Sequence, residues 1–291
     1  MILTHKSDVI FFDGDFRAWD ESVLHITSHS LHYASAVYEG IRCNNGVLFY
    51  PKLHIERLKQ SMNLLGLSLE YDLDQLIPQL SELITVNKFQ ELAEVYIRVI
   101  VWCGNNKMTV NNLGVDIHIA AFAWPRPRPD PTPRRLSIGK WQRFDPNSFP
   151  IHAKSAGLYT SSALNIVQAQ KQGFNDALML DSRGYISEAT SSHFFALIDG
   201  KLHTPTTFSC IEGITRKMVI EKIAPQLGLK LYERDIGLRE LSAAEACFLT
   251  GTAVGILPVA SVTTQEQEYL FLNQRFALDI LDEYLRLKSS E

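Results

Sequence analysis

From Pro125 to Pro133 every second residue of the chain is a proline. Proline donates no backbone hydrogen bond, and it pushes the residue before it toward extended geometry. Neither a helix nor a central strand can run through this segment, so we interpret it as a stiff connector rather than as a docking motif for a partner, because the chain on both sides has the pattern of a folded domain. The sequence therefore predicts an N-terminal domain over residues 1–124, a connector over 125–135 and a C-terminal domain over 136–291.

The composition excludes two broad classes of protein. The chain has 291 residues, of which 46% are hydrophobic, and its formal net charge is −4. A disordered chain is less hydrophobic and more highly charged, and a protein that binds nucleic acid through a general basic field has an excess of lysine and arginine. No uncharged apolar run approaches the length of a membrane span. We therefore expect a folded protein that binds neither nucleic acid nor a membrane.

The cysteines and the N-terminus indicate a reducing compartment. The four cysteines are far apart in the sequence, so there is no C-x-x-C metal or redox pair, and we expect free thiols. The segment Met1–Asp8 carries charges early and lacks the apolar stretch of a signal peptide. The sequence thus predicts a soluble, cytoplasmic protein. The cysteines are Cys43, Cys103, Cys210 and Cys247.

Both halves of the chain mix strand and helix patterns, which predicts a mixed α/β (α+β) fold. Asp13–Gly14 and Asp199–Gly200 are favoured turns between apolar runs and predict two hairpins. Apolar residues that recur at spacings of three and four, such as Ile55, Leu58 and Met62, predict helices. The expected helices cover about 55–65, 74–88, 163–172, 216–227 and 271–287, and the expected strands lie within 9–16, 47–50, 95–101, 115–122, 177–181, 193–203 and 246–250.

Lys154 is the first candidate for chemistry because no acidic residue lies near it in Ile151–Tyr159, where its neighbours are small or apolar. Burial without a counter-ion lowers the pKa of a lysine and makes a neutral amine available, which can form a Schiff base with a carbonyl. A solvated surface lysine is the simpler interpretation of the local sequence. Glu188, 34 positions later, follows a turn that contains glycine, and it is either a solvated loop carboxylate or a partner for a heterocyclic nitrogen.

Two glycine turns are candidates for binding an anion. Gly213 precedes Ile214 and Thr215 at the start of a predicted helix, where unpaired amide groups and the positive end of the helix dipole bind phosphate. Thr215 is also an ordinary residue for a helix start. The segment Gly251–Ala253 follows a predicted strand and presents a second set of amides, although a plain exit from the strand explains it equally well.

Three more candidates are polar side chains on a predicted helix or strand. Arg57 lies at the edge of the first apolar helix stripe, where a surface ion pair would account for it. Tyr96 and Arg98 alternate with apolar residues and so point to one face of a strand. An arginine on an otherwise apolar strand needs an anionic partner, which is either a structural carboxylate or a substrate.

Taken together, these pieces resemble the fold type IV pyridoxal-phosphate enzymes, and among them the branched-chain amino-acid aminotransferases. The resemblance runs from about residue 32 to residue 258, and the order of its motifs is specific although each motif alone is weak. The matching segments are His32–Arg42, Arg57–Leu58, Tyr96–Arg98, Ala153–Lys154, Leu158–Tyr159, Gly184–Glu188, Glu212–Arg216 and Thr250–Ala253.

The resemblance implies a smaller N-terminal α/β domain, a larger C-terminal pseudo-barrel domain and pyridoxal 5′-phosphate as the cofactor. Lys154 would hold this cofactor through a Schiff base and move the proton at the substrate α-carbon, and Glu188 would keep the pyridine nitrogen protonated. Tyr159 would hydrogen-bond the phenolic oxygen of the cofactor. The phosphate would be held by Arg57, Ile214, Thr215 and Thr252.

The resemblance also implies the substrates, which are leucine, isoleucine or valine with 2-oxoglutarate. Arg98 would bind the side-chain carboxylate of glutamate, and the amides of Thr252 and Ala253 would bind the α-carboxylate. A pocket that accepts both an acid and an alkyl chain needs a donor that is tolerable beside either. The remaining residues implied to line the pocket are Tyr33, Tyr38 and Tyr96.

The sequence departs from the family pattern in three places. His193 stands where the family signature usually has asparagine, Val99 follows Arg98 in place of the usual proline, and Lys107–Val110 replaces a segment that usually contains glycine. The first departure bears on the support of the cofactor, and the other two bear on the choice of amino acid.

The resemblance leaves several alternatives open. A D-amino-acid aminotransferase, an amine transaminase and an aminodeoxychorismate lyase share the fold, and a cofactor-binding protein without turnover is a more remote possibility. Tyr96–Arg98 and Thr250–Ala253 favour the branched-chain enzyme. We expect small-molecule amino and 2-oxo acids as partners, at least a homodimer, and no metal.

Overall fold

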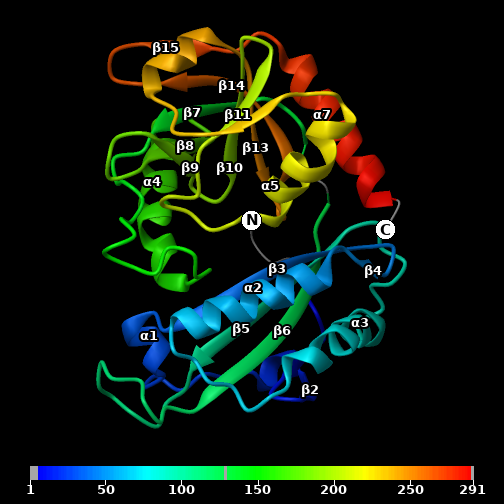
Figure 1. Ribbon diagram of the computed structural model, residues 1–291. Helices are drawn as coiled ribbons and strands as arrows, with labels where there is room; N and C mark the ends of the chain where they lie inside the picture. Colours follow the sequence, from blue (N-terminus) through cyan, green and yellow to red (C-terminus); the bar gives the residue numbers. More distant parts are fainter. Residues whose placement is uncertain (1–5, 128–129, 290–291) are drawn as a thin grey trace. The chain divides into compact units, whose positions relative to one another are not determined.

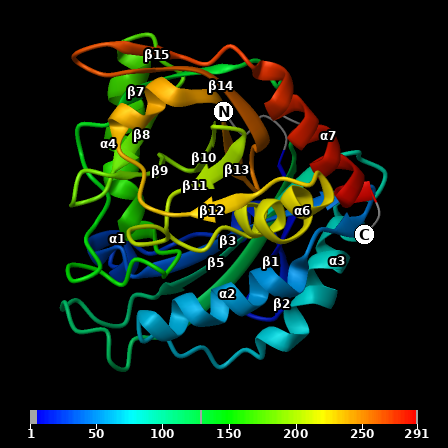
Figure 2. The same ribbon diagram turned by 45° about the horizontal axis from the view of Figure 1, so that its top comes forward.

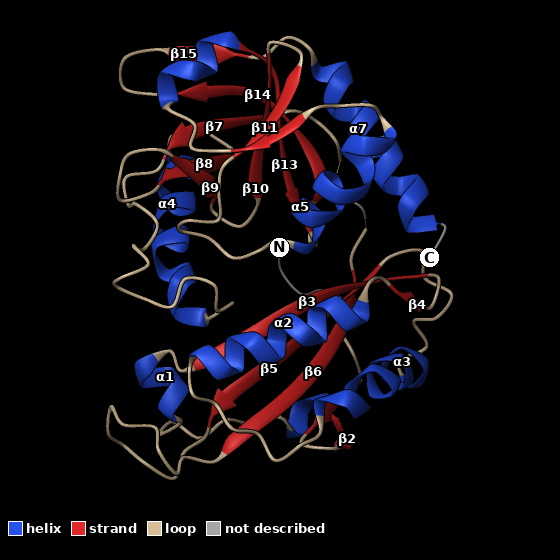
Figure 3. Ribbon diagram, in the orientation of Figure 1, coloured by secondary structure: helices blue, strands red, loops and turns tan. Residues whose placement is uncertain are grey.

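The computed structural model describes residues 6–127 and 130–289 and divides the chain into two compact units. The N-terminal unit comprises residues 1–128 together with 153–157, and the C-terminal unit comprises residues 129–152 and 158–291. Both units contain helices and sheets, which confirms the mixed α/β class (Figures 1 and 3). The start of Met1–Asp8 and Pro129 of the proline run lie outside the described residues.

An antiparallel sheet forms the framework of the N-terminal unit, and over the described residues its strand order is β2-β1-β6-β5-β3-β4. The hairpin predicted at Asp13–Gly14 is confirmed, and both turn residues have positive φ, as a tight hairpin turn requires. The strands are β1 (Val9–Phe12), β2 (Asp15–Ala18), β3 (Ala36–Asn44), β4 (Val47–Leu48), β5 (Val95–Cys103) and β6 (Ile117–Pro125).

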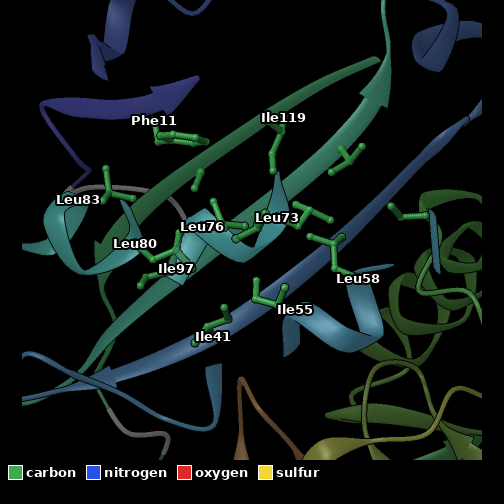
Figure 4. Close-up of a cluster of buried hydrophobic side chains, with 14 of the residues drawn as sticks. Phe11, Ile41, Ile55, Leu58, Leu73, Leu76, Leu80, Leu83, Ile97 and Ile119 are labelled. Carbon is green, nitrogen blue, oxygen red and sulfur yellow. The ribbon is translucent and has the colours of Figure 1, made fainter. Parts of the chain in front are cut away.

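Two helices cover one face of this sheet, and their apolar stripes form its core (Figure 4). The helix α2 (Pro51–Leu64) and the helix α3 (Leu76–Val86) match the two predicted periodic segments. Pro78 lies in the first turn of α3, where its missing N–H costs little. The unit also contains the helix α1 (His29–Tyr33) and the 3₁₀ turns η1 (Trp19–Glu21) and η2 (Leu73–Gln75).

The strand β5 has a different character on each of its faces. Val95, Ile97 and Val99 are buried in the core beneath the helices. Because side chains alternate along a strand, Tyr96 and Arg98 point to the opposite face of the sheet. The sheet therefore separates an apolar core from a face that carries aromatic and cationic side chains.

The sheet of the C-terminal unit closes on itself, as the expected pseudo-barrel requires. Its strand order over the described residues is β12-β11-β10-β13-β14-β7-β8-β9, and β9 also pairs with β10 through the single residue pair Glu188 and His193. This bridge joins both ends of the path from β10 to β9 into a ring. The strands are β7 (Arg134–Ile138), β8 (Asp176–Leu180), β9 (Ile186–Ala189), β10 (His193–Ile198), β11 (Lys201–Thr204), β12 (Leu231–Glu233), β13 (Ala244–Gly251), β14 (Gly255–Thr263) and β15 (Glu268–Leu270).

Helices flank this barrel, and Figure 2 shows α4 and α7 beside its strands. The helix α4 begins four residues before the predicted start, at the candidate Tyr159, and ends before Gly173, whose φ is +83°. No helix of the described residues is long and apolar enough to cross a membrane. The helical segments are η3 (Ala156–Leu158), α4 (Tyr159–Lys171), α5 (Ile214–Met218), the π-helical turn η4 (Val219–Ile223), α6 (Ala224–Gln226), η5 (Leu238–Ala243) and α7 (Gln274–Ser289).

Several strands escape prediction from the sequence. The strand β3 mixes tyrosine, glutamate, glycine and arginine with apolar residues, so it lacks the simple alternation of an exposed strand. A strand was expected within 115–122, and β6 continues beyond it through Pro125, which is tolerated because a strand end need not donate a hydrogen bond. The strand β7, which was not expected, begins at Arg134. The ends of the expected connector therefore belong to strands.

Candidate functional site

The segment Ala153–Gly157 packs with the N-terminal unit, although its place in the sequence suggested the C-terminal domain. The backbone N–H of Tyr38 donates to the carbonyl of Lys154 at 3.1 Å, and the backbone N–H of Lys154 donates to Ser61 Oγ at 2.9 Å. Val37 and Ser155 form an isolated antiparallel bridge. These bonds attach Lys154 to β3 and α2. Lys154 therefore belongs to the N-terminal unit, although the residues on both sides of 153–157 belong to the C-terminal unit.

The amine of Lys154 lies against the ring of Tyr38. Its Nζ is 5.0 Å from the ring centroid, and the Cζ of Arg98 lies 4.4 Å from the same centroid. The N-terminal unit thus brings together three predicted site residues, which contribute an amine, an aromatic ring and a guanidinium. Lys154 is half-buried, as are Tyr38 and Arg98.

Tyr96 joins this group because Gly40 leaves room for it. A Cβ atom at Gly40 would lie 1.7 Å from Tyr96 Oη, so only glycine allows the phenol to cross the backbone of β3. The ring of Tyr96 contacts Trp124 at 4.9 Å between centroids. Arg98 Nε is buried and has no hydrogen-bond partner among the described residues. An unsatisfied buried donor of this kind favours an anion as the missing partner.

Tyr33 has a more exposed position than the other implied pocket residues. It is 41% exposed at the end of α1, whereas Tyr96 is only 5% exposed. The ring of Tyr33 contacts the rings of His29 and His32 at 4.6 and 6.2 Å between centroids. These contacts are local to α1, so the place of Tyr33 in a substrate pocket stays a prediction.

Arg57 is held by a buried ion pair on the inner side of α2. Its Nε and Nη2 donate to the two oxygens of Glu39 at 2.6 and 2.9 Å, and His54 Nδ1 lies 2.7 Å from Glu39 Oε2. The bidentate pair uses two of the five N–H donors of the guanidinium. Glu39 therefore fixes the plane of Arg57, and because Arg57 is buried, the alternative of a surface ion pair is wrong.

The electrostatics of this cluster keep Glu39 ionised. Burial works to raise the pKa of Glu39, but the charges of Arg57 and His54 and their hydrogen bonds hold it well below its usual range. Burial lowers the pKa of His54, against the attraction of Glu39. The cluster is thus a carboxylate and a guanidinium with an imidazole whose charged form is disfavoured by burial.

In the C-terminal unit, Glu188 lies on the fully buried strand β9. Arg143 Nη2 is 3.0 Å from Glu188 Oε1, and the same guanidinium donates to Ser162 Oγ and to the carbonyl of Ser209. Arg143 is only 3% exposed. The interpretation of Glu188 as a solvated loop carboxylate is therefore wrong, since a strand and a buried cation enclose it.

His193 lies between Glu188 and the start of α5. Its Nδ1 is 3.7 Å from Glu188 Oε2, and a Cβ atom at Gly213 would lie 2.2 Å from its Nε2. Gly213 is the N-cap of α5, and its carbonyl accepts the first helical hydrogen bond from the N–H of Lys217. The amides of Ile214 and Thr215 lie in the first turn, before the first helical hydrogen bond. The imidazole of His193 packs against Gly213 at the start of this turn.

Glu188, His193 and Cys210 offer ligand atoms within 4.8 Å of one another, a spacing compatible with a metal ion. Burial, together with the charge of Glu188, raises the pKa of the Cys210 thiol above its usual range. A protonated thiol is a poor metal ligand, and the guanidinium of Arg143 already neutralises Glu188. The environment of this cluster therefore disfavours a cation.

Thr252 and Ala253 lie in the turn between β13 and β14, where the N–H of Val254 donates to the carbonyl of Gly251. Thr250 pairs with His193 across β13 and β10, which brings this turn beside the buried carboxylate cluster. Tyr159 is the half-buried first residue of α4. The C-terminal unit thus carries Tyr159, Glu188, Ile214, Thr215, Thr252 and Ala253, and the N-terminal unit carries the other candidates.

Sequence reasoning missed three residues that surround the candidate site residues Arg57 and Glu188. They are Glu39, His54 and Arg143. Glu39 on β3 and His54 on α2 pair across elements, and both are buried polar side chains. Arg143 has no periodic context at all. A charged residue between Val37 and Ile41 is the sequence signal that could have identified Glu39, because such a residue needs a partner if the segment is buried.

Comparison with known proteins gives a family and related solved structures. The family model described as "Amino-transferase class IV" matches residues 36–262. The branched-chain-amino-acid aminotransferase of Escherichia coli (strain K12) is 34% identical over 270 residues, which cover 89% of this chain and 86% of that protein.

Two solved structures share the fold along almost the whole chain. The branched-chain aminotransferase from Thermoproteus uzoniensis with norvaline has a TM-score of 0.90 and 30% identity, and the match covers 97% of this chain and 94% of that one. The branched-chain amino acid aminotransferase from Thermobaculum terrenum in its PLP form has a TM-score of 0.88 and 26% identity, and the match covers 98% of this chain and 94% of that one.

The Glu39 cluster generates a prediction about stability. Glu39→Gln leaves Arg57 buried without its counter-charge, so we expect the free energy of unfolding at pH 7 to fall by about 3 to 5 kcal/mol. Because the folded-state pKa of Glu39 is depressed, its contribution is present above the unfolded pKa and is lost as the pH falls. Urea unfolding at a series of pH values measures both effects.

The exposed Glu82 on α3 provides the control, and Glu82→Gln should change stability by less than about 0.5 kcal/mol. The difference between wild type and Glu39→Gln should shrink steadily below about pH 4.5, the ordinary pKa of a glutamate. A difference that stays constant between pH 7 and pH 3 would contradict the ion-pair account.

Proposed function

Because the chain belongs to the class IV aminotransferases, we propose that it transfers the amino group between branched-chain L-amino acids and 2-oxoglutarate, with pyridoxal 5′-phosphate as its cofactor. One observation carries this proposal. Lys154 Nζ and Arg98 Cζ lie 5.0 and 4.4 Å from the centroid of the Tyr38 ring. An amine that can condense with a carbonyl therefore shares one aromatic surface with a cation that can bind a carboxylate.

Both units carry side chains of the kinds that pyridoxal phosphate requires. When bound, pyridoxal phosphate supplies a ring that withdraws electrons from the substrate α-carbon. Lys154 would hold the cofactor covalently, and its amine would carry the proton to and from that carbon. The buried carboxylate of Glu188 accepts a hydrogen bond from the pyridine nitrogen and favours its protonated form. Arg143 keeps this carboxylate in place from the other side.

The phosphate has both cationic and backbone donors in this proposal. Arg57 is a buried cation that its pair with Glu39 holds in one orientation, and the amides of Ile214 and Thr215 open a helix. Thr252 completes the set from the turn after β13, and Tyr159 hydrogen-bonds the phenolic oxygen. Each group is typical of phosphate or phenolate recognition, and burial of most of them strengthens their interactions.

The substrate side combines apolar and polar walls. Tyr33, Tyr38 and Tyr96 give aromatic surface for the side chain of leucine, isoleucine or valine, and Arg98 binds the side-chain carboxylate of glutamate. The amides of Thr252 and Ala253 hold the α-carboxylate. Among the described residues, the buried Nε of Arg98 has no hydrogen-bond acceptor. This supports the assignment, because a substrate carboxylate would supply one.

We also propose that the enzyme is at least a homodimer and works in the cytoplasm. Large apolar side chains are exposed on two neighbouring segments of the N-terminal unit, with Val23 at 80%, Ile26 at 75% and Val110 at 79%. His29 joins these segments through bonds to the carbonyls of Gly104 and Thr109. A second copy of the chain would cover this surface. The buried free thiols suit a reducing compartment.

Reduction with borohydride tests the role of Lys154. The purified enzyme should show the visible absorption band of a lysine Schiff base, and borohydride should abolish it and leave a phosphopyridoxyl group on the peptide that contains Lys154. Lys154→Ala should lack both the band and the modified peptide. Lys140→Ala is the matched control, and a modified peptide elsewhere in the chain would refute the assignment.

The choice of amino donor separates the proposed activity from its relatives of the same fold. L-Leucine should bleach the band in a single half-reaction, and D-alanine should leave it unchanged. 2-Oxoglutarate should then restore it. Bleaching by D-alanine alone would indicate a D-amino-acid aminotransferase, and a band that no amino acid bleaches would indicate a binding protein without turnover.

Arg98 should matter more for the acidic substrate than for the alkyl one. In Arg98→Ala the half-reaction constant for L-glutamate should fall about tenfold or more, since a charged hydrogen bond is lost, and the constant for L-leucine should fall much less. Stopped-flow absorbance with both amino acids measures the ratio. Equal losses would mean that Arg98 supports the sheet rather than the substrate.

A further inference from the structure

Three arginines surround the ring of Tyr96 on one face of the N-terminal sheet. The Cζ atoms of Arg42, Arg98 and Arg126 lie 5.8, 5.9 and 5.2 Å from the ring centroid. Arg126 follows β6 at the start of the proline-rich segment, and its backbone N–H donates to the carbonyl of Glu94 at 3.0 Å. The register of β5 and β6 therefore determines where Arg126 lies.

Only one of these three charges is balanced by an acid. Arg42 Nη1 is 3.3 Å from Glu94 Oε2 and also donates to the carbonyl of Arg126 at 2.8 Å. Across residues 6–127 and 130–289, neither Arg98 nor Arg126 has a carboxylate or a side-chain hydrogen-bond partner. Among the described residues, the aromatic face thus carries two positive charges that no carboxylate balances.

Keeping these two cations together is unfavourable in the absence of an anion. Burial lowers the pKa of Arg126, and the charge of Arg98 lowers it further, against the opposing influence of Tyr96. Arg126 is half-buried, so water compensates only part of this cost. An anion between the two guanidinium groups would offset both the desolvation and the repulsion.

We propose that Arg126 is a specificity-determining residue that joins Arg98 in a two-cation site for the side-chain carboxylate of 2-oxo and 2-amino dicarboxylic acids. This inference rests on the proposed function and deepens it. With Arg98 alone, the pocket would accept either an acidic or an alkyl side chain. A second guanidinium shifts the binding preference toward the dicarboxylic substrate. The ring of Tyr96 and its neighbour Trp124 keep an apolar wall for branched alkyl chains.

Two unreactive ligands of matched length test this site in the holoenzyme. Glutarate and 4-methylvalerate share a five-carbon chain and one carboxylate, but only glutarate has a second carboxylate at the far end. Calorimetric titration should give an affinity for glutarate that falls about tenfold in Arg126→Gln, and an affinity for 4-methylvalerate that falls less than about threefold. Arg126→Lys should retain part of the glutarate affinity.

Arg17→Gln is the matched control, because Arg17 also stacks on an aromatic ring of this sheet, that of Phe12 at 4.5 Å, and has no proposed role in binding. It should change neither affinity. Added salt should weaken glutarate binding more in the wild type than in Arg126→Gln. Equal losses of both ligands in Arg126→Gln, or no loss of either, would overturn the two-cation site.

The same variants distinguish this inference from the proposed function. If wild-type holoenzyme reacts with L-leucine and L-glutamate but Arg126→Gln changes their ratio less than about threefold, the two-cation site is wrong and the aminotransferase stands. If no amino acid reacts but glutarate binding still depends on Arg126, the activity is wrong and the anion site stands.

Discussion

A carboxylate that is buried in a folded protein must be paired, and both units of this chain meet that requirement with an arginine from another element. Glu39 on β3 receives Arg57 from α2, and Glu188 on β9 receives Arg143 from the loop after β7. Desolvation would otherwise make each carboxylate too costly to keep ionised. The pairs also fix the positions of side chains. The first orients Arg57, which we propose binds the phosphate, and the second orients Glu188, the proposed partner of the pyridine nitrogen.

The closure of the C-terminal barrel depends on the same neighbourhood. Glu188 and His193 form the single bridge between β9 and β10, and the imidazole fills the space beside Gly213 at the start of α5. This explains how the chain accommodates histidine where the family signature usually has asparagine. Glycine at position 213 leaves room for the larger ring, so the imidazole contacts both the buried carboxylate and the turn that carries the helix-start amides.

Much of the fold could be predicted from the sequence. The residues that hold the candidate site residues in place, such as Glu39 and Arg143, could not. The stripe of Ile55, Leu58 and Met62 predicted α2, because helical periodicity is a repeating local signal. The strand β3 was missed because its tyrosine, glutamate, glycine and arginine residues break the alternation of an ordinary strand. Arg143 was missed because its partner lies on another strand, and no local pattern records such a contact.

By itself the sequence determined the mixed α/β class, most of the helices and hairpins, and which reactive groups are available, since side-chain periodicity and turn preferences act over a few residues. Only the tertiary structure decided that Lys154 packs with the N-terminal unit and that Arg98 and Arg126 both lie near the ring of Tyr96. These contacts depend on strand register and on backbone hydrogen bonds between segments far apart in the sequence. They are properties of the packed molecule, because burial and close approach arise only when distant elements fold against one another.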